Sequence, residues 1–337
     1  MGVKLSPIIL KRAITFEELA HKRIAIDGLQ CLYQFLSSIR QLDGTPLMDN
    51  KGRITSHLMG IWARFSNLIQ KNIKLAIVFD GEPPKLKMRE SLFRTKRKED
   101  AKLRYEDAKN EEDLPSMLRY SKQFIHISEE MIQEAKQLLH AMGLPVIQAP
   151  AEADAQMAYM NRQNDVWACG TTDYDVLLHQ APRMITNLTL SQKRKYGSGK
   201  VVAITPELIE LKEVLKTLDI TQERLIALAL MTGTDYNPEG IKNIGPKKAL
   251  KLVKQYPTIT ALKQAIPIDF PWEEIENIFL RMEIIKNYQL DWTPVEVDAV
   301  KKILVEKHNF SEERIDATLK KGEQARPKGQ KSLGDFS

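Results

Sequence analysis

Cysteine is scarce in this sequence. Among 337 residues only Cys31 and Cys169 are cysteines, too few for the disulfide framework that stabilises small secreted domains. Neither these cysteines nor the six histidines form a C-x-x-C or H-x3-H pattern, which excludes the usual structural zinc sites. We therefore expect a protein of a reducing compartment that contains no structural zinc.

Long apolar runs are also missing. The longest spans residues 225–231, far short of the roughly 18 residues that a membrane helix needs, and the N-terminus lacks the apolar stretch of a signal peptide. Hydrophobic residues make up 43% and charged residues 28%, which excludes a wholly disordered chain. We expect a soluble protein with no membrane partner. At about 150 residues per domain, its length allows two domains or one large domain with insertions.

Short apolar segments alternate with helical patterns in the first half of the chain. Residues 23–26, 75–79, 144–147 and 166–169 predict strands, and residues 29–39, 57–70 and 151–160 predict helices. This alternation is typical of βαβ units, in which helices bury both faces of a parallel sheet. We therefore predict an α/β fold with a mainly parallel central sheet and helices on both faces.

The second half of the sequence is mostly helical in pattern. Residues 223–231 predict an amphipathic helix and residues 233–238 a turn, and the segment 240–248 opens another helix. In that segment Gly240 and Gly245 allow a tight turn, Pro246 suits a first helical position, and Lys247 and Lys248 lie near free helix amides that suit a phosphate. Because glycine-rich turns before helices are common, a purely structural role stays open. The residues after position 319 predict a disordered tail.

The excess of positive charge, 50 Lys and Arg against 44 Asp and Glu, is concentrated in one segment. Residues 85–98 contain seven Lys or Arg and only Glu90 as an acid, within a stretch, 85–143, that shows no strand pattern. A solvated helix face explains such a run equally well. However, the stretch follows directly on the carboxyl end of a predicted strand, where α/β folds place functional loops.

Two acidic residues follow predicted strands. Asp27 and Asp80 each stand in an Asp-Gly pair directly after an apolar strand. A single Asp-Gly pair is usually only a turn. Ligands of open α/β sheets, however, bind outside the carboxyl ends of the strands, so two such pairs favour a site at that edge.

Four further acids occupy comparable positions. Glu152 and Asp154 lie in the first turn of a helix that follows a strand, where they also suit the helix dipole. Asp173 and Asp175 leave the next strand, and residues two apart on an extended segment point to the same side. We therefore expect all six carboxylates to meet at one edge of the sheet.

Such a cluster needs cations, because unpaired carboxylates repel one another and raise each other's pKa. Oxygen ligands without histidine or cysteine select Mg²⁺ or Mn²⁺ over zinc. Two such ions about 4 Å apart are the usual device for in-line displacement at phosphorus. The pattern predicts phosphodiester hydrolysis.

The rival reaction class is nucleotide-driven phosphoryl transfer, which needs a glycine-rich phosphate loop. The nearest match is the string Gly-Ser-Gly-Lys at 197–200. It fails, because Arg194 stands where a Walker motif needs Gly and Val201 where it needs Ser or Thr.

Five motifs resemble those of a known family. The strings IAIDG followed by YQFL, VFDGEPPKLK, APAEADAQMAYM, TTDYDVLL and MTGTDYNPEGIKNIGPKKAL are similar to the successive motifs of the flap endonucleases, structure-specific 5′ nucleases, in order and at family spacing. The likeness covers nearly the whole chain and is greatest to archaeal members. It implies a PIN-like 5′-nuclease fold with a helical arch insertion and a helix-hairpin-helix.

The resemblance also implies a domain organisation. A single 5′-nuclease domain spans residues 1–325, with an N-terminal nuclease region at 1–105, an arch insertion at about 82–130 and an internal nuclease region at 122–258. The helix-hairpin-helix lies at about 225–256 within that internal region. Residues 326–337 form a flexible tail.

By the same resemblance, seven acids form the metal site and bind two Mg²⁺ ions, for which Mn²⁺ can substitute. They are Asp27, Asp80, Glu152, Asp154, Asp173, Asp175 and Asp235. Asp154 departs from the family, which usually has Glu at this position. Its shorter arm displaces one ion by about a methylene or adds an intervening water.

Other residues are implied in DNA binding. Lys87 and Arg94 match residues that reach over the metals from the first arch helix, and their spacing of two helical turns lets both contact the scissile phosphate. Tyr33 matches the aromatic on which the terminal unpaired base stacks, although a half-buried core position explains it equally well. The hairpin at Gly240 and Gly245 is implied to hold K⁺ against a duplex phosphate, so recognition depends on shape rather than base sequence.

The last residues resemble the box that binds the sliding clamp (PCNA). Gln330, Leu333 and Phe336 stand in its positions, and Ser337 replaces the second aromatic of the family. We expect a monomer that partners branched duplex DNA with a 5′ flap, in the archaeal cytoplasm at the nucleoid, or in the nucleus of a eukaryote.

The expected activity is cutting at the base of 5′ flaps, with 5′-3′ exonuclease activity, in Okazaki fragment maturation and long-patch base excision repair. Two alternatives stay open. One is a related repair nuclease that acts on bubbles or DNA ends, against which the compact insertion counts. The other is a non-catalytic DNA-junction binder loaded on the clamp, which Asp154 in place of Glu favours.

Overall fold

The computed structural model describes residues 3–41, 43–87, 99–107, 113, 116, 119–120, 123, 125–189, 193–195 and 201–324. Four residues with predicted roles, Arg94, Gln330, Leu333 and Phe336, lie outside the described residues.

Seven of the described strands form one sheet in the order β1-β9-β6-β5-β2-β3-β4. Its neighbouring strands β6, β5, β2, β3 and β4 pair in parallel, while β9 pairs antiparallel with β6 and with β1. The prediction of a mainly parallel sheet is confirmed, and the antiparallel edge is an addition to it. The bounds are β1 Arg12–Ala13, β2 Arg23–Asp27, β3 Lys74–Phe79, β4 Val146–Gln148, β5 Ala168–Gly170, β6 Arg183–Thr186 and β9 Glu207–Glu210, and a separate hairpin pairs β7 Lys193–Lys195 with β8 Val201–Ala203.

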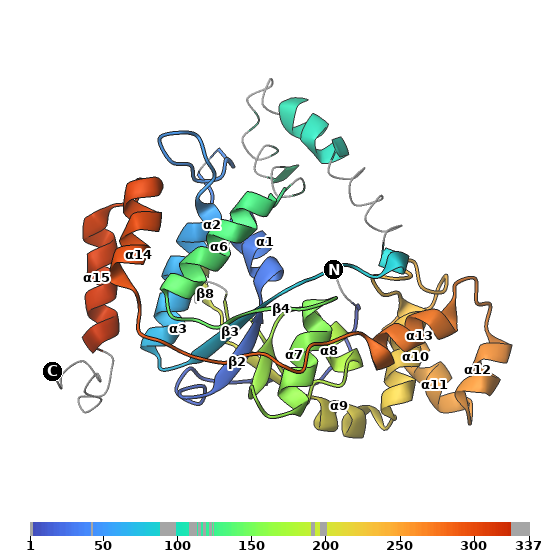
Figure 1. The fold of residues 1–337 in the computed structure, drawn as a ribbon. Helices are drawn as coiled ribbons and strands as arrows, with labels where there is room; N and C mark the ends of the chain where they lie inside the picture. The colour runs from blue at the N-terminus through green and yellow to red at the C-terminus, as the bar shows by residue number, and fades with distance from the viewer. Residues whose placement is uncertain are drawn as a thin grey trace.

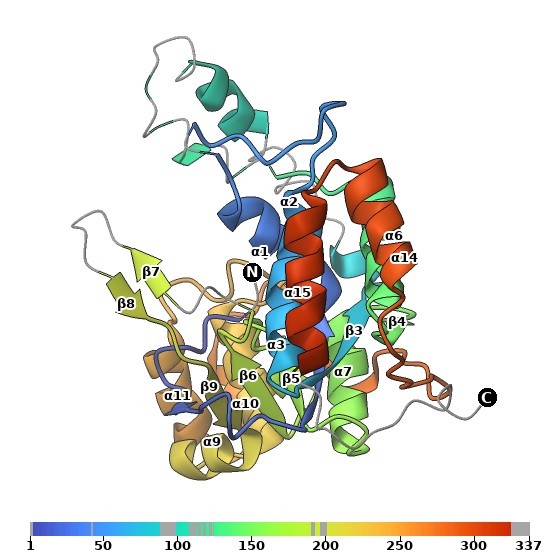
Figure 2. The same cartoon turned by 90° about the vertical axis from the view of Figure 1, so that its left-hand side faces the viewer.

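Helices cover both faces of this sheet (Figure 1). On one side lie α1 Gly28–Ser38, α2 Ser56–Gly60, the π-helical turn η1 Ile61–Phe65, α3 Ser66–Gln70, α6 Glu129–Ala141, α14 Val297–Lys301, the π-helical η3 Lys302–Lys307 and α15 Glu312–Gln324. On the other side lie α7 Ala153–Arg162, α8 Asp175–Leu178, α9 Leu211–Leu218, α10 Gln222–Thr232, α11 Pro246–Gln255, α12 Ile259–Ala265 and α13 Trp272–Arg281. A 3-10 turn, η2 Lys85–Lys87, follows β3, and helix 99–107 stands away from the sheet in both views (Figures 1 and 2).

The central strand β2 shows why both faces are covered. Ile24 and Ile26 point into the core beneath α1 and α6, whereas Ala25 between them belongs to the core beneath α7 and α10. All three side chains are fully buried. Because successive side chains of a strand point to opposite faces, a strand that is apolar at every position needs a layer on each side.

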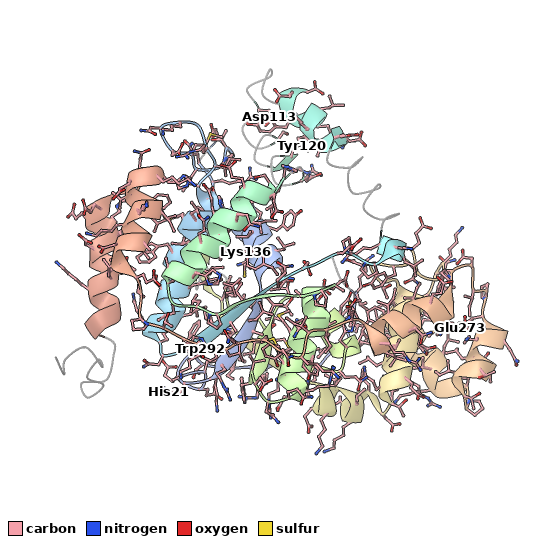
Figure 3. The ribbon with its side chains drawn as sticks, in the orientation of Figure 1. His21, Asp113, Tyr120, Lys136, Glu273 and Trp292 are labelled. Carbon is pink, nitrogen blue, oxygen red and sulfur yellow. The ribbon has the colours of Figure 1, made fainter. Side chains whose placement is uncertain are left out.

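An extended segment, residues 282–296, links the two helical layers. It leaves α13 and crosses the sheet to α14 (Figure 1). Trp292, labelled in Figure 3, donates its indole N–H to the carbonyl oxygen of Leu75 in β3 at 2.7 Å. The backbone N–H groups of Thr293 and Glu296 donate to the carbonyl oxygens of Gly143 and Ala141. These bonds attach the C-terminal helices to the sheet.

Helix α10 differs from its prediction. The sequence predicted an amphipathic helix, but every residue from Leu225 to Thr232 is buried. The helix packs among α8, α11, α12 and α13, and a helix surrounded in this way has no face left for solvent. The prediction failed because the surrounding helices come from other parts of the chain, α8 from before α10 and the other three from after it.

The start of the tail also differs from its prediction. Disorder was expected directly after Leu319, but α15 continues to Gln324. Within α15 the side chain of Ile315 is buried. Two acids of the same helix, Glu312 and Asp316, form ion pairs with Lys301 of α14. Packing against α3 and α14 therefore keeps residues 320–324 helical despite their polar composition.

The cysteines and the apolar helices can be compared with what the sequence predicted. Cys31 and Cys169 are both free thiols, and both are buried. Over the described ranges, no helix has the length and apolar character to cross a membrane.

Candidate active site

Carboxylates follow the ends of the neighbouring parallel strands β4, β3, β2 and β5. Asp27 is the last residue of β2, Asp80 follows β3, and Asp173 follows β5. Glu152 follows β4 and directly precedes α7. Since parallel strands end at one edge of the sheet, these side chains meet there although they are up to about 150 positions apart in the sequence.

Asp27 and Asp80 each bind the start of a helix. Asp27 accepts a hydrogen bond from the backbone N–H of Gln30 at 2.8 Å and so caps α1. Asp80 accepts from the backbone N–H of Ala153 at 2.6 Å, one of the donors that the start of α7 leaves free. This second bond joins the end of β3 to the helix that carries the next pair of acids.

Glu152 and Asp154 stand at the start of α7. Glu152 is the N-cap residue, but its side chain makes no capping hydrogen bond. Its Oε2 instead accepts from the hydroxyl of Tyr236 at 2.6 Å, and its Oε1 pairs with Lys87. Asp154 is half-buried in the first turn, and its Oδ1, which is buried, has no hydrogen-bond partner. Capping of the helix therefore does not account for this pair.

Asp173 and Asp175 converge for a different reason than predicted. The chain is not extended here, because Asp175 already begins α8. Its backbone N–H donates to Oδ1 of Asp173 at 3.1 Å. The carboxylate of Asp175 in turn accepts from the backbone N–H of Val3 at 3.2 Å. A turn into a helix, rather than strand alternation, brings the two acids together.

Asp235 and Lys87 complete the cluster. Asp235 lies in the turn after α10, is buried, and has its Oδ2 3.5 Å from the Nζ of Lys87. Lys87 belongs to the 3-10 turn η2 and pairs with Glu152 as well. Although burial alone would lower it, these two carboxylates raise the pKa of Lys87. Its ammonium group is therefore a fixed positive charge among the acids.

The acids influence one another electrostatically. Burial, followed by the charge of Asp80, raises the pKa of Asp27 to about 8. Burial also raises the pKa of Asp80 and of Asp173. For Asp154 and Asp175, burial and then the charge of Asp173 raise the pKa well above its ordinary range. Lys87 alone leaves this cluster short of positive charge.

The residues present fit a divalent cation that binds oxygen. The donors are carboxylates throughout, which suit Mg²⁺ or Mn²⁺, and Asp154 offers a buried oxygen without a hydrogen-bond partner. Over the residues that the structure describes, no group of three or more Asp, Glu, His or Cys side chains is arranged so that it could hold a metal ion. The carboxylates therefore lie close together, and in this structure Lys87 forms ion pairs with two of them, Glu152 and Asp235.

Tyr33 lies on α1 and is 40% exposed. This exposure favours a ring that faces solvent over a position in the core. An exposed aromatic ring on the helix that Asp27 caps suits a stacking platform beside the carboxylates.

The hairpin between α10 and α11 has the predicted proline but uses its glycines unequally. Pro246 is the first residue of α11. Gly240 has φ +56°, and a Cβ there would lie 2.6 Å from backbone atoms of Met231 and Gly233. Gly245 is the N-cap at φ −96°, and a Cβ there would meet nothing within 4 Å. Of the two glycines expected to allow the tight turn, only Gly240 is sterically required.

Lys247 and Lys248 are both exposed beside this hairpin. The Nζ of Lys248 donates to the carbonyl oxygen of Asn243 at 3.3 Å, within the loop. With Gly245 lacking a side chain, the start of α11 is open to an approaching anion.

Sequence reasoning missed several residues that support the acids. Tyr236 donates to Glu152, and the hydroxyl of Thr171 accepts from the backbone N–H of Asp173 at 3.0 Å. Gln30 accepts the N–H of Thr172 at 2.8 Å with its side chain. Tyr236 stands next to Asp235 in a quoted motif, so a tyrosine beside a predicted ligand was an available signal. No feature of the sequence could have predicted the hydrogen bond from the backbone N–H of Val3 to Asp175.

Two family models match parts of this chain. Residues 1–101 match the XPG N-terminal domain and residues 143–235 the XPG I-region. The flap endonuclease 1 of Staphylothermus marinus is 47% identical over 323 residues, which cover 94% of this chain and 92% of that protein.

Two solved structures share the fold. Flap endonuclease-1 from Methanococcus jannaschii has a TM-score of 0.77 at 38% identity, covering 96% of this chain and 98% of that one. The catalytic core of Rad2 in complex with DNA substrate has a TM-score of 0.70 at 22% identity, covering 94% and 97%, and shows likeness of fold alone. Staphylothermus and Methanococcus are archaea, in agreement with the archaeal resemblance. The chain belongs to the flap endonuclease 1 family.

Proposed function

We propose that this protein is a Mg²⁺-dependent 5′ nuclease that cuts DNA at the base of 5′ flaps and degrades 5′ ends as an exonuclease. The observation that carries the proposal is the set of seven acids, four of them buried and three half-buried, that meet at the carboxyl edge of the sheet with Lys87 among them. The family supplies the substrate class. Okazaki fragment maturation and long-patch base excision repair are the processes that produce such flaps.

The carboxylates are proposed as ligands of two Mg²⁺ ions, which Mn²⁺ can replace. When bound, such ions activate a water for attack on phosphorus and neutralise the leaving oxygen. Asp27 and Asp80 are held by the helix starts that they cap, and Glu152 by Tyr236. Asp154 and Asp175 bring oxygens that burial keeps away from bulk water. Asp173 and Asp235 complete the set.

DNA is proposed to bind through phosphates rather than bases. Lys87, with Arg94 as its partner, is placed to stabilise the scissile phosphate, and the exposed ring of Tyr33 to stack on a terminal base. Lys247, Lys248 and the open helix start at Gly245, with a K⁺ ion at the hairpin, are proposed to hold the duplex. Such contacts select the shape of a junction.

The remaining assignments concern organisation and partners. We propose one nuclease domain over residues 1–325 that acts as a monomer in the archaeal cytoplasm. The tail at 326–337, with Gln330, Leu333 and Phe336, is proposed to bind the sliding clamp. Deletion of residues 330–337 should leave flap cutting intact but remove its stimulation by the clamp.

The decisive experiment maps products from a 5′-labelled double-flap substrate in Mg²⁺ and in EDTA. The wild type should release the flap only in Mg²⁺. Asp175→Ala should bind the same DNA without cutting it, whereas Asp298→Ala, which removes an exposed acid of α14 far from the cluster in sequence, should cut normally. Binding without cutting by the wild type would favour the non-catalytic junction binder, and cutting within bubbles would favour the related repair nuclease.

A further inference from the structure

Glu152 is held at both of its carboxylate oxygens. The hydroxyl of Tyr236 donates to Oε2 at 2.6 Å, and Lys87 pairs with Oε1. Only 6% of Glu152 is exposed, so water contributes little to its orientation. The direction of this carboxylate is therefore set by two protein donors, one neutral and one charged.

The neutral donor is fixed by its own surroundings. The hydroxyl and the backbone N–H of Thr234 donate to Oδ1 of Asn237 at 2.6 and 3.1 Å, and the N–H of Tyr236 donates to the Thr234 hydroxyl at 3.1 Å. Asn237 in turn donates to the carbonyl oxygen of Leu230 at 2.7 Å. The ring of Tyr236 packs edge-on against Phe279 of α13 with centroids 5.6 Å apart. The hydroxyl thus sits on a rigid turn.

The two donors respond differently to a cation. The phenol of Tyr236 is neutral, and its hydroxyl orients Glu152 through the hydrogen bond to Oε2 without cancelling the negative charge. The ammonium group of Lys87 does cancel it and therefore competes with any metal ion for Oε1. An incoming divalent cation can displace Lys87 while the bond from Tyr236 persists.

We propose that Tyr236 is a positioning residue that keeps Glu152 directed into the carboxylate cluster while a divalent cation takes the place of Lys87. This inference rests on the proposed function, because it assigns Tyr236 to the same site. The alternative is that Tyr236 serves only as a core aromatic against Phe279. The positioning role requires the hydroxyl of Tyr236, whereas packing against Phe279 requires only the ring.

Tyr236→Phe removes the hydroxyl and keeps the ring. The chain offers a matched control in Tyr288, whose hydroxyl donates to the carboxylate of Asp165 and whose ring packs edge-on against Tyr159. Tyr288→Phe therefore deletes a bond of the same kind outside the cluster. Both variants are first compared with the wild type by circular dichroism and thermal unfolding.

The main measurement is Mn²⁺ binding to the DNA-free protein, followed by electron paramagnetic resonance. Removing a partner that orients a metal ligand typically costs about 10- to 100-fold in metal affinity, and we expect Tyr236→Phe to raise the Mn²⁺ dissociation constant by about 10-fold or more. Tyr288→Phe should leave it unchanged. If Tyr236→Phe binds Mn²⁺ as tightly as the wild type, the inference is overturned, whatever its effect on stability.

A double-mutant cycle tests whether the hydroxyl acts through Glu152. In a Glu152→Ala background, adding Tyr236→Phe should not weaken Mn²⁺ binding further, and an additive loss would refute the proposed route. Both arms of this comparison lack the Glu152 carboxylate that Tyr236→Phe alone would leave without its neutral donor, so the comparison remains possible even if the single Tyr236→Phe variant does not fold.

Single-turnover cutting adds a second readout. Tyr236→Phe should lower the rate at limiting Mg²⁺, recover part of it at high Mg²⁺, and keep the DNA dissociation constant of the wild type. A loss confined to DNA affinity would count against the inference. Failure of the wild type to cut flaps would instead refute the proposed function. The comparison of Mn²⁺ dissociation constants would still decide the role of Tyr236.

Discussion

Asp27 can be used to test whether the carboxylates repel one another when no cation is bound. Its side chain has two tasks, because it carries a buried charge and also caps α1 through the N–H of Gln30 at 2.8 Å. Asp27→Asn removes the charge and retains an oxygen for the cap. In metal-free protein, this variant should be more stable than the wild type at alkaline pH and close to it in acid.

The size of the effect follows from the raised pKa of Asp27, about 8 against an ordinary value of 3.8. When folding raises the pKa of an acid, that acid makes its full contribution to the free energy of unfolding at pH values below its pKa in the unfolded chain. This contribution is lost as the pH rises through the folded pKa. About three pH units of this titration lie between about pH 5 and 9, each worth about 1.4 kcal/mol. The wild type should therefore lose about 4 kcal/mol over that range relative to Asp27→Asn.

Urea unfolding in EDTA across that pH range measures this difference. Asp27→Ala is the control for the cap, and loss of the cap should cost about 1 kcal/mol at every pH. Saturating Mg²⁺ should abolish most of the decline of the wild type, because the cation compensates the charge of Asp27. Parallel pH profiles of wild type and Asp27→Asn in EDTA would refute the reasoning, as would a wild type that becomes more stable towards alkaline pH.

Three further predictions test other parts of the molecule. Lys87→Ala should lower the single-turnover rate of flap cutting by about 100- to 1000-fold with little change in DNA affinity, and a loss confined to affinity would overturn its assigned role. Gly240→Ala should lose at least about 1 to 3 kcal/mol of stability because of its positive φ, with a clash in addition, whereas Gly245→Ala should unfold in urea like the wild type. Leu228→Ala in the buried helix α10 should cost about 2 to 5 kcal/mol, and a cost below about 1 kcal/mol would show that α10 is less closely packed than the structure has it.

Local patterns predicted much of the fold and the identity of the acids. Apolar runs such as 75–79 read as strands because a strand buried on both faces must be apolar at every position. Asp27 and Asp80 were found because each stands at the end of such a strand, and Glu152 because it stands at the start of the helix that follows one. The antiparallel strands β1 and β9 escaped notice, since Arg12–Ala13 has two residues and Glu207–Glu210 has four, too few to show a clear period.

Sequence alone therefore determined which residues have the chemistry of the site and on which edge of the sheet they gather, because strand ends and helix starts are local properties. Only the tertiary structure decided how those residues are held. The bonds from Tyr236 to Glu152, from Ala153 to Asp80 and from Val3 to Asp175 each join positions more than 70 apart in the chain. No local pattern specifies such a pair, since the partner is chosen by the order of the strands and by the packing of helices that fold onto them from elsewhere.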